Sequence, residues 1–192
     1  MGLSLDLTKR YTYADYYTWL DNTRRELLHG LIRLMSPAPT PQHQKIIFKL
    51  SGELYHFIRK NKGKCEVFPA PFDVRLPKNG EKEDDKIDTV VQPDICIVCD
   101  PAKIDRRGCL GAPDFIAEVQ SLSTSKYDLT QKFTLYEASG VREYWVVFPS
   151  EGVQVFLLQS NGKYDEGTMY ENGKIPIHIF GGLEIDLEEI VA

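Results

Sequence analysis

The clearest pattern of hydrophobic and polar positions lies in the segment GAPDFIAEVQS, residues 111–121. Side chains of a strand alternate between the two faces of a sheet, so residues 115–120 divide into two rows. One row is Phe115, Ala117 and Val119, and the other is Ile116, Glu118 and Gln120. Because an unpaired buried carboxylate is costly, Glu118 on such a strand needs a partner and becomes a candidate for function.

Apolar residues at helical spacing predict one long helix in the first half of the chain. Thr40 is its N-cap, Pro41 is its first residue, and it extends to about Arg59. Its apolar stripe consists of Ile47, Leu50, Leu54 and Ile58.

Capping boxes predict the starts of two further helices. Thr12 and Asp15 open a short helix over residues 12–20. Asp128 and Gln131 open a longer one. The apolar residues of the longer helix, and the glycine near which it ends, are Leu129, Phe133, Tyr136 and Gly140.

Turn residues divide the remaining chain into strands and hairpins. The predicted strands are two short ones within residues 26–36 that meet at Gly30, then 65–77, 89–100, 112–120 and 142–148. Pro69 and Pro71 make the strand 65–77 an edge strand or a bulged one. Residues 78–88 form a solvated loop between strands. Asn-Gly pairs at Asn161 and Asn172 predict C-terminal hairpins.

The order of the central elements is helix, strand, strand, strand, helix, strand. The third and fourth strands are joined by a helix and should be parallel, whereas the earlier hairpin connections make antiparallel pairs. The sequence therefore predicts an α/β fold of the α+β mixed kind, with a mixed sheet flanked by helices. An N-terminal helix and hairpin and the C-terminal hairpins are additions to this αβββαβ core.

A second polar residue lies on the predicted strand 89–100. Alternation places Asp94 on the face that also holds Gln92 and Cys96. Neighbouring strands are about 4.8 Å apart, so Asp94 and Glu118 can converge if the register allows. Two such carboxylates repel each other unless a cation lies between them, and a hard ion such as Mg²⁺ suits oxygen ligands. A hydrogen-bonded core residue is the ordinary alternative, and for Asp94 it stays open.

Composition narrows the class of protein. The 192 residues, 42% hydrophobic and 27% charged, fit one globular domain spanning 1–192. The N-terminal sequence has no signal-like apolar run, and no segment approaches the roughly 20 apolar residues of a membrane span. We therefore expect a cytoplasmic protein that does not bind membranes.

The cysteines are expected to be reduced thiols, because no secretory signal precedes them. They are Cys65, Cys96, Cys99 and Cys109. Cys96 and Cys99 have C-x-x-C spacing, but an odd offset on a strand directs the two sulfurs to opposite faces. No second pair with zinc spacing follows, so a zinc site is disfavoured.

Charge is unevenly distributed, although the net charge is only −5. Between Arg24 and Lys64 there are nine basic residues and two acidic ones, Glu26 and Glu53, so this segment carries +7 and the remainder −12. Such a basic segment is a candidate for contacts with the phosphates of a nucleic acid, and a merely solvated face is the alternative.

Several motifs in one order resemble a known family. They are RELLHGLIRLMSPAPTPQHQ, QPDICIV, GAPDFIAEVQSLST, DLTQKFTLYEASGVREYWVV and GGLEIDLEEI, which together cover roughly residues 11–190. This set resembles the Uma-type family of restriction endonucleases within the PD-(D/E)XK nuclease superfamily. The resemblance implies a restriction-endonuclease-like fold and metal-dependent hydrolysis of DNA.

The resemblance also implies roles for individual residues. Asp94 and Glu118 would bind Mg²⁺ or Mn²⁺, with a lysine beside them. Gln120 stands where the motif has this lysine, and an amide cannot supply positive charge. The family suggests that the lysine has moved to the following helix, where Lys132 matches; a surface pair of Lys132 with Asp128 is the alternative.

Two further residues are candidates on the same grounds. Glu26 matches an acidic residue before the first hairpin of the family and is a candidate third metal ligand; a surface glutamate is the alternative. His43 lies one turn before Ile47, points toward the sheet, and is a candidate for phosphate contact or for supporting a metal ligand.

The sequence therefore predicts a metal-dependent endonuclease that hydrolyses DNA phosphodiester bonds, with Asp94, Glu118, Gln120 and Lys132 as catalytic residues. A catalytically silent nucleic-acid-binding or assembly module with the same fold is the alternative, because Gln120 replaces the lysine. A two-carboxylate hydrolase of sugars is a third reading, which would need no metal. A homodimer is expected, since two symmetric sites can cut both strands.

Overall fold

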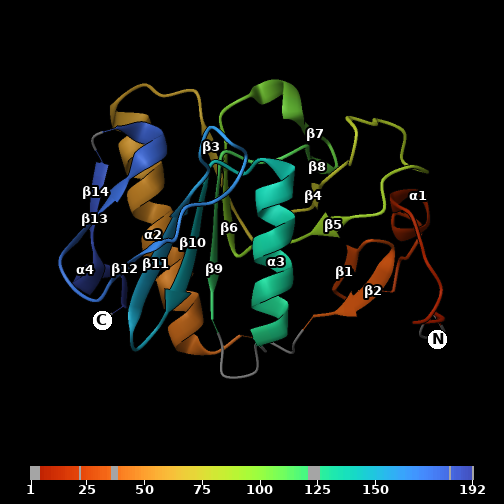
Figure 1. Ribbon diagram of the computed structural model, residues 1–192, viewed down its shortest axis with the longest axis horizontal. Coiled ribbons are helices and arrows are strands. Elements are labelled where there is room, and N and C mark those ends of the chain that lie inside the picture. Colours follow the sequence, from red (N-terminus) through yellow and green to blue (C-terminus); the bar gives the residue numbers. More distant parts are fainter. Residues whose placement is uncertain (1–4, 22, 36–38, 121–125, 182, 192) are drawn as a thin grey trace.

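The computed structural model describes residues 5–21, 23–35, 39–120, 126–181 and 183–191, with only the backbone for 126–129. A central six-stranded sheet has the order β12-β11-β10-β9-β6-β3. Its strands are β3 (Glu66–Pro69), β6 (Ile95–Val98), β9 (Phe115–Val119), β10 (Glu143–Phe148), β11 (Gly152–Leu157) and β12 (Thr168–Tyr170). Figure 1 shows this sheet between the helices α2 (Pro41–Lys60) and α3 (Lys126–Ser139).

The strand directions of the central sheet agree with the prediction. β9 and β10 pair in parallel, and α3 connects them. β3 pairs with β6, and β6 with β9, both antiparallel. β3 is an edge strand, as Pro69 and Pro71 indicated. The mixed sheet and its flanking helices are therefore confirmed.

Alternation along the strands gives the central sheet two buried faces. Ile95, Ile97, Phe115 and Ala117 belong to the core under α2, and Cys96, Val98 and Ile116 to the core under α3. The buried residues of α2 are Ile46, Leu50, Leu54 and Ile58. Ile46 thus takes the place predicted for Ile47, which is only partly buried against the same core.

A second six-stranded sheet has the order β2-β1-β5-β4-β8-β7. Its strands are β1 (Arg25–Leu28), β2 (Leu31–Leu34), β4 (Val74–Arg75), β5 (Val90–Val91), β7 (Ile104–Asp105) and β8 (Gly108–Leu110). The predicted hairpin at Gly30 is confirmed by the pairing of β1 with β2. The helix α1 (Tyr13–Tyr16) packs beside this sheet, at the end of the molecule opposite β13 (Lys174–Ile177), β14 (Leu183–Asp186) and α4 (Leu187–Val191) (Figure 1).

Two predicted strands are each divided between the two sheets. Residues 89–100 form β5 in one sheet and β6 in the other, and residues 65–77 likewise form β3 and β4. Pro93 interrupts the first, and the cis peptide Ala70–Pro71 interrupts the second, because proline supplies no N–H to a ladder. The two interruptions meet where the Ala70 N–H donates to the Asp94 carbonyl at 3.0 Å. The candidate residue Asp94 thus lies where the chain changes sheets.

Two helix boundaries and one hairpin were predicted wrongly. α1 ends at Tyr16 rather than Leu20, although the Thr12 N–H donates to Asp15 Oδ2 at 2.9 Å as its capping box requires. α3 begins at Lys126, so Asp128 lies inside the helix instead of capping it. The turn at Asn172 joins β12 to β13, which belong to different sheets, so it closes no hairpin.

The cysteines differ from the expectation of reduced thiols. Cys65 and Cys99 form a disulfide, because the antiparallel pairing of Glu66 with Val98 places the two residues opposite each other just beyond the strand ends. Cys96 and Cys109 are free and buried. Short 3₁₀ helices at Pro101–Lys103 and His178–Phe180 complete the described elements, and none of the helices in these residues has the length and apolar character to cross a membrane.

Candidate active site

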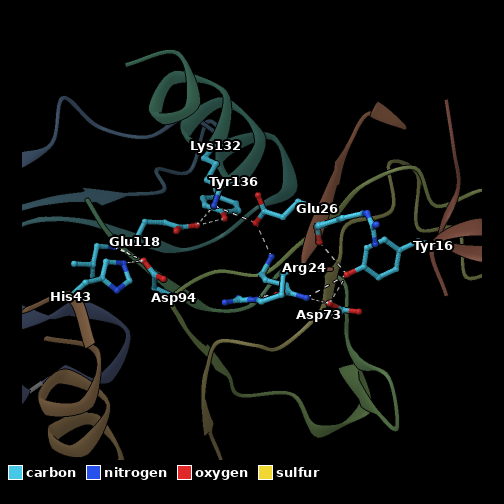
Figure 2. Close-up of polar contacts among 12 residues, drawn as sticks. Tyr16, Arg24, Glu26, His43, Asp73, Asp94, Glu118, Lys132 and Tyr136 are labelled. Atoms are coloured by element: carbon cyan, nitrogen blue, oxygen red, sulfur yellow. Dashed lines mark hydrogen bonds and ion pairs between the residues drawn. The ribbon is translucent and has the colours of Figure 1, made fainter. Parts of the chain in front are cut away.

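Asp94 and Glu118 occupy facing positions on neighbouring strands. β6 begins at Ile95, which pairs with Ala117 of β9, so one further step of the register sets Asp94 opposite Glu118. Oδ2 of Asp94 accepts a hydrogen bond from the Val119 N–H at 2.8 Å. Figure 2 shows the two acidic side chains close together where β6 begins and β9 ends. The predicted convergence of the two carboxylates is therefore present.

The carboxylate of Glu118 is held by two side chains of α3. Oε1 accepts from Lys132 Nζ at 2.9 Å and from the Tyr136 hydroxyl at 2.7 Å (Figure 2). Burial raises the pKa of Glu118, and the negative charges of Asp94 and Glu26 raise it further, whereas the ammonium of Lys132 opposes them. Glu118 thus lies in a concentration of negative charge that favours a bound cation.

Lys132 bridges two carboxylates. Its Nζ lies 3.3 Å from Glu26 Oε1 in addition to its contact with Glu118. Burial alone would lower the pKa of Lys132, but the charges of Glu118 and Glu26 raise it, so the side chain is an ammonium. Glu26 is itself buried on β1, where Oε1 also accepts from the Gln92 N–H at 2.9 Å. The structure thus brings Glu26 of β1 together with Glu118 of β9 and Lys132 of α3, although Glu26 and Lys132 are 106 residues apart in the sequence.

The three carboxylates share a pattern of hydrogen bonding. In each carboxylate, one oxygen makes both of the polar contacts with neighbouring described residues, and the other makes none. The oxygens that make the contacts are Asp94 Oδ2, Glu118 Oε1 and Glu26 Oε1. Within the described part of the chain, their second oxygens accept no hydrogen bond. The buried Glu143 differs, since Oε1 accepts from the Trp145 indole N–H and Oε2 from the Ile179 N–H. Asp94, Glu118 and Glu26 thus each have one carboxylate oxygen that no described residue occupies, whereas both oxygens of Glu143 are occupied.

His43 lies beside Asp94 on the first turn of α2. Nε2 is 3.2 Å from Asp94 Oδ2, and the hydrogen bond to Asp94 raises the pKa of the imidazole despite partial burial. Nδ1 is buried and has no hydrogen-bond partner among the described residues. The Thr40 cap fixes this first turn, since Oγ1 accepts from the His43 N–H at 3.2 Å. His43 can therefore orient Asp94.

Gln120 is not linked to the other candidates. Its main-chain N–H donates to the Val147 carbonyl at 2.8 Å and continues the pairing of β9 with β10. Its side chain is half-buried and makes no hydrogen bond within the ranges that the structure describes. The alternative partner of Lys132, the side chain of Asp128, lies outside those ranges.

Sequence reasoning missed several residues that support the site. Tyr136 was assigned only to the apolar stripe, although its position four residues after Lys132 places it on the same helix face. Gln92 links the site to a polar cluster, because Nε2 donates to Asp73 Oδ1 at 2.8 Å and Oε1 accepts from the Arg24 guanidinium. The Tyr16 hydroxyl joins this cluster at 3.2 Å from Asp73 (Figure 2). These contacts connect different elements, so no local pattern indicated them.

The donor set suits a hard divalent ion with few protein ligands. No three His, Cys, Asp or Glu side chains of the described residues are gathered so that they could hold a metal ion by themselves. Mg²⁺ typically takes one or two carboxylates and keeps waters and substrate phosphate for its other positions. The second oxygens of Asp94 and Glu118 fit this requirement. Glu26 contacts Lys132 as Glu118 does, and it stays a candidate third ligand, directly or through water.

The architecture defines the class of protein as restriction-endonuclease-like in fold. A crystal structure of a protein from Anabaena variabilis ATCC 29413, described as "a putative nuclease belonging to DUF820", is similar with a TM-score of 0.74 and 18% sequence identity over 94% of this chain and 97% of that one. The model of the Uma2 family, described as "Putative restriction endonuclease", matches residues 13–188. The chain belongs to the Uma2 family. No curated protein sequence matches it significantly. Family and fold support a nuclease function.

Proposed function

We propose that the protein is a metal-dependent endonuclease that hydrolyses DNA phosphodiester bonds. The observation that carries this proposal is the pair of facing carboxylates, Asp94 and Glu118, with an ammonium 2.9 Å from one of them. Each carboxylate keeps one oxygen without a hydrogen bond to the described protein. This combination can bind a cation and a phosphate group together.

The residues divide the chemistry between them. Asp94 and Glu118 would hold Mg²⁺ or Mn²⁺, which when bound supplies Lewis-acid polarisation of the phosphate and a more acidic water. Lys132 stabilises the negative charge that develops on the phosphoryl oxygens, because its ammonium is buried and preorganised. Gln120 lies two residues beyond Glu118 and can accept a hydrogen bond from the attacking water. His43 orients Asp94, and Glu26 orients Lys132.

Metal removal gives the first test. Supercoiled plasmid incubated with the protein and Mg²⁺ or Mn²⁺ should be converted to nicked or linear forms, and EDTA should prevent this conversion because the carboxylates alone cannot polarise the phosphate. Asp94→Asn serves as the control for contaminating nucleases. Equal cleavage by wild type and Asp94→Asn, or cleavage that persists in EDTA, would contradict the proposal.

A catalytically silent nucleic-acid-binding or assembly module is the second candidate. The observation in its favour is that Gln120 occupies the motif position of the lysine, while Lys132 is paired with both Glu118 and Glu26. This module would bind DNA in the plasmid experiment and leave it intact with either metal.

DNA contacts are proposed for the basic cluster of α2 and the turn that follows it. Five of the nine basic residues of the segment are exposed there, namely Lys45, Arg59, Lys60, Lys62 and Lys64. Others are engaged in the protein: Arg25 is buried with Asp21 at 2.6 Å, and Arg33 donates to Gln131. Four of them, Arg59, Lys60, Lys62 and Lys64, lie together at and just after the C-terminal end of α2 and form a local positive surface for phosphates in a protein of net charge −5.

The salt dependence of DNA binding should report on this cluster. In the double variant Arg59→Ala/Lys60→Ala, the slope of log affinity against log salt should fall by about 1–2, since each duplex phosphate contact contributes about 0.9. Fluorescence anisotropy with labelled duplex in the absence of metal measures the slope. The matched control is Lys86→Ala/Lys174→Ala, which removes two exposed lysines elsewhere. Equal slopes for the two double variants would contradict the proposal that these basic residues contact DNA phosphates.

A homodimer is part of this proposal, because two sites related by a twofold axis would cut the two strands of a duplex. Analytical ultracentrifugation with and without duplex tests it, and a monomer in both would favour nicking of single strands.

A further inference from the structure

Tyr136 is a buried residue of α3 that the proposed chemistry does not use. Its ring lies in the core under α3, and its hydroxyl donates a hydrogen bond to Glu118 Oε1 at 2.7 Å. It follows Lys132 by four residues, so both side chains reach Glu118 from the same helix face (Figure 2).

The two donors of α3 converge on one oxygen. Lys132 Nζ at 2.9 Å and the Tyr136 hydroxyl at 2.7 Å both occupy Oε1. A carboxylate bound through a single oxygen by two donors of one rigid helix has a fixed rotation about its terminal bond. Its other oxygen, Oε2, therefore has a fixed direction, and none of the described residues donates to it.

A neighbouring tyrosine shows that burial in this core does not require such a bond. Tyr144 of β10 is fully buried and packs edge-to-face on Tyr136, with ring centroids 5.1 Å apart. Its hydroxyl is buried without a hydrogen-bond partner in the described part of the protein. The two rings share one environment, but only the hydroxyl of Tyr136 is directed at the candidate metal ligand.

We propose that Tyr136 is a positioning residue of the nuclease site, which holds Glu118 so that Oε2 is presented to the divalent ion. The inference rests on the proposed function, since it assigns to Tyr136 a part in binding the metal ion of that site. Partners that orient a metal ligand typically contribute 10- to 100-fold in metal affinity. The hydroxyl of Tyr136 has this relation to Glu118.

The test is Mn²⁺ binding to the full chain, measured by isothermal titration calorimetry for wild type, Tyr136→Phe and Tyr144→Phe. Each variant loses one buried hydroxyl and keeps its ring, and thermal unfolding verifies that both are folded. Tyr136→Phe should bind Mn²⁺ about 10- to 100-fold more weakly than wild type, and Tyr144→Phe should bind it as wild type does. In plasmid cleavage, saturating Mn²⁺ should restore most of the activity of Tyr136→Phe.

The other outcomes overturn the inference in distinguishable ways. Wild-type affinity in Tyr136→Phe refutes the positioning role and leaves the nuclease proposal intact. Equal weakening in both variants refutes it as well, because the effect would then come from packing. If wild type itself binds no Mn²⁺, the metal-dependent function fails, and the role of Tyr136 fails with it.

Discussion

Glu118→Gln should reduce both Mn²⁺ affinity and plasmid cleavage by more than about 100-fold, since losing a metal ligand costs at least as much as losing a residue that orients one. The amide keeps the shape of the side chain, and its oxygen can still accept from Lys132 and Tyr136. What is lost is the charge and the second oxygen, because the NH₂ group that replaces Oε2 cannot bind a cation. Calorimetry with Mn²⁺ and the plasmid assay measure the two effects, and the thermal midpoint should fall, because Lys132 loses one of its two charged partners in a buried ion pair.

Glu143→Gln is the matched control for this substitution. Glu143 is also a buried carboxylate on the central sheet, but both of its oxygens accept hydrogen bonds from Trp145 and Ile179. The amide nitrogen cannot accept, so one buried donor loses its partner, at a cost of about 1–3 kcal/mol in unfolding free energy. We expect a lower thermal midpoint with unchanged Mn²⁺ affinity. If Glu143→Gln weakened Mn²⁺ binding as much as Glu118→Gln, loss of fold rather than loss of a ligand would explain both.

Lys132→Met should reduce the rate of cleavage by about 10²- to 10³-fold, the usual effect of removing one preorganised group that stabilises transition-state charge. Methionine has a similar length and lacks the ammonium, so the DNA phosphate loses this group while Asp94 and Glu118 remain. Removing one partner of a buried ion pair also costs up to about 3–5 kcal/mol, and the thermal midpoint should fall. The rate is therefore measured well below that midpoint, with Mn²⁺ affinity determined in parallel.

The control for Lys132 is another lysine that pairs with α3. Lys163 Nζ lies 2.9 Å from Glu137 Oε1 but is largely exposed, so Lys163→Met should alter neither cleavage nor stability by a measurable amount. Cleavage by Lys132→Met at the wild-type rate would remove the lysine from the mechanism. Mn²⁺ binding that fails in Lys132→Met would instead assign the lysine to the metal site.

Much of the central fold follows from local patterns. The period of two along residues 115–120 correctly separated Phe115 and Ala117 from Ile116 and Glu118, because a sheet with helices on both sides gives each row its own core. The Thr40 cap and Pro41 correctly marked the start of α2. Residues 89–100 were read as one strand although Pro93 interrupts it, and only the tertiary structure shows that the two halves belong to different sheets.

The candidate site was predicted in its residues but not in its contacts. Resemblance and alternation indicated Asp94, Glu118, Glu26, His43, Lys132 and Gln120. His43 contacts Asp94, and Lys132 contacts both Glu118 and Glu26, whereas Gln120 contacts none of the others. The disulfide of Cys65 and Cys99 was missed because it depends on the pairing of two strands 34 residues apart. Tyr136 was missed because a tyrosine on an apolar stripe looks like core until its hydroxyl has a partner.

The amino-acid sequence by itself determined where the main helices and strands lie, which row of residues 115–120 is apolar, and which residues have ionisable side chains. These properties depend on the residue and its near neighbours along the chain. Only the tertiary structure decided which oxygen of each carboxylate is occupied, that Lys132 lies between Glu26 and Glu118, and that Tyr136 holds Glu118. Hydrogen bonds and ion pairs depend on distances of about 3 Å between atoms of different elements. Those distances are fixed when the sheets and α3 pack together.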